Sequence, residues 1–164
     1  MVGIGWEGLP LKTGQGLGGP AIGDGALNGA TRKMVRIVLA DDHEIVRAGL
    51  RGIISQHEDW GVCGEAANGV EAVAKVVELK PDVVILDITM PVMSGLEAAI
   101  KIRQLAPSTK ILMLSMHDAV LMANVLSLAA PDGYLSKATA THDLIGTLTA
   151  VMEKKAVISP LPRM

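Results

Sequence analysis

From Met34 onward, short apolar runs alternate with segments in which apolar residues recur every three or four positions. This alternation constrains the fold more than any other feature, because β-branched runs favour strands and a 3.6-residue period favours helices. The run 82–87 (DVVILD) is apolar on both faces, as is typical of a central strand in a parallel sheet. The expected strands are 35–40, 61–66, 82–87, 110–115 and 132–135.

A helical segment follows each expected strand. Asn68 stands three residues before Glu71 and Ser94 three residues before Glu97, and both pairs are typical of a capped helix start. The helix residues expected to face the core are, in chain order, Val46, Leu50, Ile53 and Ile54 (helix 43–56), Val70, Val73 and Val77, Leu96, Ile100 and Leu105, Leu121, Val125 and Leu128, and Leu144, Leu148 and Met152 (helix 141–153).

Five strand–helix pairs in strict alternation predict an α/β fold with a doubly wound five-stranded parallel sheet, the flavodoxin-like (βα)5 arrangement. Ligands of such sheets bind beyond the carboxyl ends of the strands, where the strand order reverses. The residues that follow each strand are therefore the candidates for function.

Residues 1–33 have a different composition, since they hold ten of the 18 glycines and show no apolar period. We expect a flexible extension or leader there, because glycine has the largest entropy cost of ordering. The pattern G-x-G-x-x-G occurs twice within it, but no strand precedes it and no helix follows, so a dinucleotide site is disfavoured. The expected domain is 34–156, and the proline-containing 157–164 are expected to begin a linker or tail.

Charge and composition exclude several classes of protein. The net charge of −2 gives no basic field for nucleic acid and no charged block for a membrane surface. The single cysteine, Cys63, excludes an intrachain disulfide, and no apolar run is long enough to span a bilayer. These features favour a cytoplasmic protein.

Polar residues end four of the expected strands and should converge at one edge of the sheet. Asp41 and Asp42 follow the first strand, Asp87 ends the third, Ser115 ends the fourth and Lys137 follows the fifth. Neighbouring carboxylates repel each other, and Mg²⁺, which prefers oxygen ligands, relieves that repulsion. A free carboxylate can then attack phosphorus while the hydroxyl and the ammonium contact the phosphoryl oxygens.

The motifs and their spacing resemble a known family. The chain contains VRIVLADDHEIVRAGL, VVILDITMPVMSGLEA, ILMLSMHD and DGYLSK. An acidic pair, an Asp before x-x-M-P-x-M-x-G, a Ser 28 residues later and Tyr-x-x-Lys follow in order. Residues 34 to about 156 resemble the receiver domain of a bacterial two-component response regulator of the NarL/FixJ type, with its CheY-like fold.

The resemblance implies a role for each matching residue. Asp87 would accept a phosphoryl group from a sensor histidine kinase, with Lys137 and Ser115 holding the phosphoryl oxygens. Mg²⁺ would be bound by Asp42, Asp87 and the backbone carbonyl of Thr89, with Asp41 acting through water. Ser115 and Tyr134 would form the switch, with Tyr134 moving inward on phosphorylation and altering the surface of the fourth helix, fifth strand and fifth helix.

Two local departures and two neighbouring residues complete the site. Lys137 precedes Ala138 where many receivers have a proline, often cis, and Pro131 should hold Ala130 in an extended conformation. His43 is interpreted as a helix-start or solvated residue rather than a metal ligand. Gly95 is expected to allow a loop conformation that a Cβ would strain.

The expected function is signalling, with at most slow self-dephosphorylation. Relatives of this type carry a C-terminal helix-turn-helix domain absent from this chain, through which DNA and transcription would be reached. A phosphorylation-dependent homodimer and a single-domain regulator acting by protein contacts remain alternatives.

A Mg²⁺-dependent phosphohydrolase is a further alternative, although Thr89 stands where a haloacid-dehalogenase-like enzyme would need a second carboxylate. A flavin or nucleotide binder is disfavoured by the acidic strand ends.

Overall fold

A computed structural model describes residues 33–117, 127–155 and 157–158. Its strands are β1 (Val35–Ala40), β2 (Trp60–Ala66), β3 (Val83–Asp87), β4 (Lys110–Ser115), β5 (Gly133–Ser136) and β6 (Val157–Ile158). Its helices are α1 (Glu44–Ile54), α2 (Gly69–Leu79), α3 (Gly95–Leu105) and α5 (Ala140–Met152). No described helix is both long enough and apolar enough to cross a bilayer.

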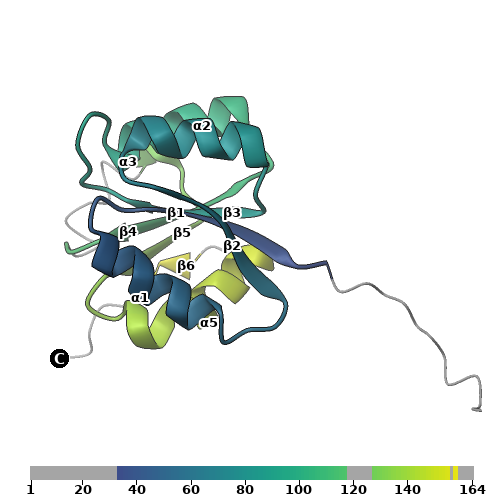
Figure 1. Ribbon diagram of the computed structural model, residues 1–164. Helices are drawn as coiled ribbons and strands as arrows, with labels where there is room; N and C mark the ends of the chain where they lie inside the picture. The colour runs from purple at the N-terminus through teal and green to yellow at the C-terminus, as the bar shows by residue number, and fades with distance from the viewer. Residues whose placement is uncertain (1–32, 118–126, 156, 159–164) are drawn as a thin grey trace, which may run out of the picture. The chain divides into compact units, whose positions relative to one another are not determined.

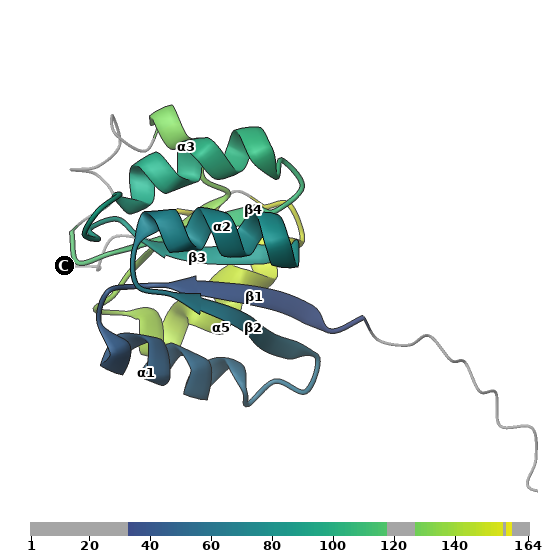
Figure 2. The same cartoon turned by 45° about the horizontal axis from the view of Figure 1, so that its top comes forward.

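The strands form one parallel sheet in the order β2-β1-β3-β4-β5-β6. Helices α2 and α3 cover one face, and α1 and α5 cover the other (Figures 1 and 2). The predicted doubly wound α/β fold is therefore confirmed. The order reverses between β1 and β3, which places the carboxyl ends of these two strands side by side.

Both predicted helix caps are present. The Asn68 side chain accepts a hydrogen bond from the Glu71 amide at 2.9 Å, and Ser94 forms a reciprocal capping box with Glu97. The cap at Ser94 also fixes the point at which the loop after β3 ends and α3 begins.

The inward faces of α2 and α3 agree with the prediction only in part, since Val73, Leu96 and Ile100 are partly buried against the core. Val70 and Val77 are 47% and 46% exposed, and the buried positions of α2 are Gly69, Ala72 and Val76. In α3, Leu105 is 62% exposed while the buried positions are Gly95, Ala98, Ala99 and Ile102. Small residues let both helices pack close to the sheet. The prediction favoured large apolar side chains and therefore chose positions next to the buried ones. The predicted core-facing residues of α1 and α5 are confirmed. Val46, Ile53 and Met152 are partly buried, and Val151 is a further buried residue that was not predicted.

The C-terminal part of the sheet contains two further differences. Five strands were expected, but Val157 and Ile158 add a short sixth strand beside β5, within the segment expected to be a linker. Ala130 has a φ of 42°, which is left-handed rather than extended as predicted. Leu121 and Val125 of the expected fourth helix, and the expected extension up to residue 32, lie outside the described residues. Leu128 of that helix was expected to face the core but is 73% exposed.

Candidate functional site

Four strands bring the predicted polar residues to one edge of the sheet. Asp41 directly follows β1, Asp87 and Ser115 end β3 and β4, and Lys137 follows β5. Asp41, Asp87 and Ser115 are 1%, 4% and 2% exposed. Such burial is unusual for carboxylates, which are rarely buried without a partner of opposite charge.

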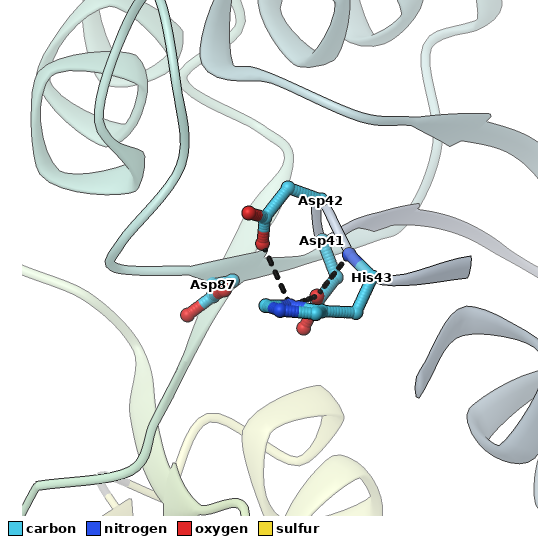
Figure 3. Close-up of side chains that lie close together, drawn as sticks. All are labelled: Asp41, Asp42, His43 and Asp87. Atoms are coloured by element: carbon cyan, nitrogen blue, oxygen red, sulfur yellow. Dashed lines mark hydrogen bonds and ion pairs between the residues drawn. The ribbon is translucent and has the colours of Figure 1, made fainter. Parts of the chain in front are cut away.

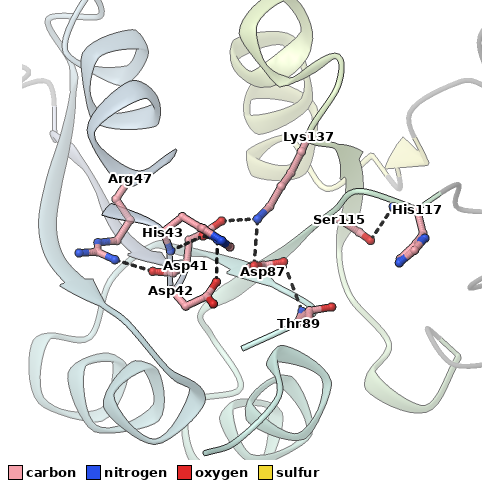
Figure 4. A network of polar contacts seen from close by, with 9 residues as sticks. All are labelled: Asp41, Asp42, His43, Arg47, Asp87, Thr89, Ser115, His117 and Lys137. Carbon is pink, nitrogen blue, oxygen red and sulfur yellow. Dashed lines mark hydrogen bonds and ion pairs between the residues drawn. The ribbon is translucent and has the colours of Figure 1, made fainter. Parts of the chain in front are cut away.

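Lys137 is that partner. Its ammonium nitrogen lies 2.6 Å from Oδ2 of Asp41 and 2.9 Å from Oδ2 of Asp87 (Figure 4). Burial alone would lower the pKa of Lys137, but the hydrogen bonds to the two carboxylates outweigh it, so the pKa is raised above the ordinary 10.5. The lysine is therefore a fixed positive charge between β1 and β3.

The pKa of Asp87 is set by a different balance of effects from that of Lys137. Burial raises the pKa of its carboxyl, the hydrogen bond from Lys137 lowers it, and the negative charge of Asp41 raises it again. The net result is a pKa above the ordinary 3.8. The ionised Asp87 is thus held in a site that disfavours its charge, which is the condition a bound cation would relieve.

Asp42 and His43 complete an acidic cluster with Asp41 and Asp87. One ligand atom from each of these four residues lies within 4.8 Å of the others (Figure 3). His43 is the N-cap of α1 and its side chain is 64% exposed, as expected of a helix-start histidine. Its Nδ1 nevertheless lies 3.2 Å from Asp41 and 2.9 Å from Asp42, a proximity that the sequence analysis did not predict.

The donor set fits Mg²⁺. Three carboxylates supply hard oxygen atoms within a few ångströms, and their mutual repulsion is only partly offset by Lys137. The Thr89 amide donates to Oδ1 of Asp87 at 3.3 Å, so the start of the following loop lies against the Asp87 carboxylate. Its carbonyl as a ligand stays a prediction.

The loop from β3 to α3 is tightly closed around Asp87. The Gly95 amide donates to the Ile88 carbonyl at 2.9 Å, and a Cβ on Gly95 would lie 1.9 Å from the Asp87 carbonyl oxygen. A Cβ at this position would therefore be strained, as expected, and the reason is the close approach of the Asp87 main chain. Met90 is buried in the core and Met93 packs against it.

Ser115 and Tyr134 meet at the main chain of His117. The Ser115 hydroxyl oxygen accepts from the His117 amide at 3.0 Å, and the Tyr134 hydroxyl donates to the His117 carbonyl. Tyr134 is only 2% exposed, so the ring is already inward in this structure. The described residues contain no cis peptide bond, which includes the bond between Lys137 and Ala138.

A basic residue missed by the sequence analysis also contacts the site. Arg47 of α1 donates to the main-chain carbonyl of Asp41 (Figure 4). It also donates to Glu65 of β2. A lone arginine on a helix is usually solvent-exposed, so the sequence carries no signal that would single it out.

Comparisons with known proteins point to one family. The family model of the response regulator receiver domain matches residues 37–149. Among curated proteins, the transcriptional regulatory protein LnrK of Bacillus subtilis is 38% identical over 128 residues, covering 77% of this chain and 58% of LnrK. The oxygen regulatory protein NreC of Staphylococcus epidermidis is 42% identical over 126 residues, covering 76% of this chain and 57% of NreC. The chain therefore spans less than two thirds of these relatives.

Solved structures show the same fold. A LuxR-family two-component response regulator from Aurantimonas sp. has a TM-score of 0.73 and 35% identity, covering 77% of this chain and 91% of that one. The response regulator domain of Thermotoga maritima CheB has a TM-score of 0.68 and 28% identity, covering 73% and 97%.

Proposed function

Because this chain belongs to the response regulator receiver domain family, we propose that it accepts a phosphoryl group on Asp87 from a phosphohistidine of a sensor histidine kinase. One observation carries the proposal: Asp87 is buried at the end of β3, with Lys137 bridging it to Asp41. This arrangement offers a carboxylate nucleophile beside a fixed cation, which is what transfer of a charged group requires.

The reaction depends on Mg²⁺, which Asp42, Asp87 and the Thr89 carbonyl would hold, with Asp41 contributing through water. When bound, the ion offsets the negative charge of the carboxylates and the phosphoryl oxygens. A carboxylate oxygen of Asp87 forms the new O–P bond, the N–P bond of the phosphohistidine breaks, and the released imidazole nitrogen keeps the electron pair. The ammonium of Lys137 and the Ser115 hydroxyl donate to the phosphoryl oxygens.

Signalling follows from a change of surface rather than from turnover. The Ser115 hydroxyl hydrogen is available for a phosphoryl oxygen, since its oxygen is the atom that accepts from His117. A shift of Ser115 would pass through His117 to Tyr134 and change the surface of the fourth helix, β5 and α5. In a longer protein this surface would control a helix-turn-helix DNA-binding domain, and a phosphorylation-dependent homodimer is one route. The setting would be the bacterial cytoplasm.

A Mg²⁺-dependent phosphohydrolase and a single-domain regulator acting by protein contacts are the alternatives. Hydrolysis would need a general base near Asp87, and the residue two positions on, Thr89, supplies a hydroxyl instead of a carboxylate. We therefore expect slow self-dephosphorylation at most.

Incubation with acetyl phosphate and Mg²⁺, followed by intact mass, tests the proposal. The wild type should gain about 80 Da, the mass of one phosphoryl group, and keep it for minutes. Asp42→Ala should remain folded but accept phosphate far more slowly, because a metal ligand is lost. Rapid multiple turnover of acetyl phosphate would favour the hydrolase, and full modification of Asp42→Ala without metal would contradict the proposed site.

A further inference from the structure

The main chain that joins the two acidic residues after β1 is held from both sides. The Asp41 amide donates to the Ala66 carbonyl of β2 at 3.1 Å. The Asp41 carbonyl accepts a hydrogen bond from Nη1 of Arg47 at 2.6 Å. This carbonyl belongs to the peptide unit between Asp41 and Asp42, so its orientation sets the direction in which both side chains leave the backbone.

Arg47 is built into this position. Its side chain is 15% exposed, and its Nε donates to Oε2 of Glu65 at 3.1 Å. The planar guanidinium therefore contacts a carbonyl after β1 and a carboxylate of β2 at the same time. The ammonium of a lysine lacks this fixed, forked arrangement of donors and cannot make both contacts in the same geometry. Glu65 also accepts from Arg51, which is 54% exposed.

Resting on the proposed function, we propose that Arg47 is a positioning residue for Mg²⁺ binding. It acts through the peptide unit between Asp41 and Asp42, and Glu65 holds its guanidinium in place. Residues that orient metal ligands without touching the metal commonly change metal affinity when they are replaced. Arg51 offers a matched control, since it binds the same Glu65 carboxylate one helical turn further along α1.

The test compares Arg47→Met, Arg47→Lys and Arg51→Met in the full chain. Amide spectra without metal should show shifts at Asp42 and His43 in both Arg47 variants, and little change there in Arg51→Met. With acetyl phosphate as donor, the Mg²⁺ concentration for half-maximal modification should rise about 10-fold in Arg47→Met, the lower end of such effects. The Arg51→Met variant should stay within about twofold of wild type, as for an exposed ion pair.

Unfolding by urea identifies variants that have lost their fold. If Arg47→Met is one of them, the amide spectra of Arg47→Lys, the milder replacement, test the positioning of Asp42 instead. Full recovery of Mg²⁺ dependence by Arg47→Lys would mean that charge alone matters, and would overturn the positioning role. An equal deficit in Arg51→Met, or none in Arg47→Met, would overturn it as well. A wild type that neither binds Mg²⁺ nor accepts phosphate would instead contradict the proposed function, and the metal role of Arg47 would fall with it.

Discussion

At Asp87 the proposed role as phosphoryl acceptor conflicts with the stability of the fold. Its buried carboxyl is disfavoured as an anion, and the positive charge of Lys137 offsets this only in part, so its folded-state pKa is raised. A carboxyl with a raised pKa binds its proton more tightly in the folded protein than in the unfolded chain. Stability should therefore fall as the pH rises from the ordinary pKa of 3.8 through the folded value, and the loss is complete above it.

The direction of this pKa shift gives a prediction for Asp87→Asn, because an asparagine side chain resembles a protonated aspartate in shape. The variant should unfold at a higher urea concentration than wild type at pH 7. The gain should shrink as the pH falls below the raised pKa and vanish below the ordinary one, which urea titrations at several pH values would show. A variant that is less stable than wild type at pH 7 would mean that the ion pair with Lys137 stabilises the fold overall.

The individual site residues were largely visible in the sequence. Asp41, Asp87 and Lys137 lie together at one edge of the sheet as predicted, because parallel strands end at the same edge. The direct contacts of Lys137 with both carboxylates were not predicted. The ring of His43 beside Asp41 and Asp42, and the reach of Arg47 to a main-chain carbonyl, depend on side-chain direction in three dimensions. No spacing rule contains that information.

At the level of the elements, alternation predicted the strands well and the helix faces less well. The prediction for 35–40 and for 110–115 agrees with β1 and β4 at both ends. The choice of Val70 and Val77 as core residues was wrong, because Ala72 and Val76 face the sheet and a small alanine carries little hydrophobic signal. The left-handed Ala130 was missed because its conformation is held by contacts from afar, including a 2.8 Å hydrogen bond from Arg103 to its carbonyl.

The junction of β3 and α3 yields a second prediction. Gly95→Ala should lower stability by about 2–3 kcal/mol, since the new Cβ meets the Asp87 main chain and the loop must shift. Gly146→Ala in α5 is the matched control, because nothing lies within 4 Å of its Cβ position. It should raise stability by about 0.5–1 kcal/mol through helix propensity. Equal effects in urea unfolding would contradict the close approach at Gly95.

Coupling between β4 and β5 yields a third prediction. Ser115→Ala should still be phosphorylated, because Asp87 and Lys137 remain, but it should respond weakly to the phosphate mimic beryllofluoride. Loss of one hydrogen bond to a charged group should cost about 1.5–3 kcal/mol of coupling, or roughly 10- to 150-fold in the switched population. Amide shifts at His117 and along β5 would measure it. A wild-type shift pattern in the variant would exclude the hydroxyl as the coupling element.

For the whole molecule, every strand that the structure describes begins after Met34, so the described sheet is built from residues that follow the glycine-rich N-terminal segment. Deleting residues 1–33 should therefore change the free energy of unfolding by less than about 1 kcal/mol, since an aperiodic glycine-rich segment has little apolar surface to bury. Calorimetry of the shortened chain would check this. A large loss of cooperative unfolding would show that the segment packs on the domain.

The position of the phosphoryl group tests the central claim most directly. After reaction with acetyl phosphate and Mg²⁺, sodium borohydride reduces an aspartyl phosphate to homoserine, and peptide mass mapping then locates the reduced residue. We predict that the change lies at Asp87 and is lost in Asp87→Asn. Reduction at another residue, or equal phosphate uptake by Asp87→Asn, would contradict the assignment of Asp87 as the acceptor.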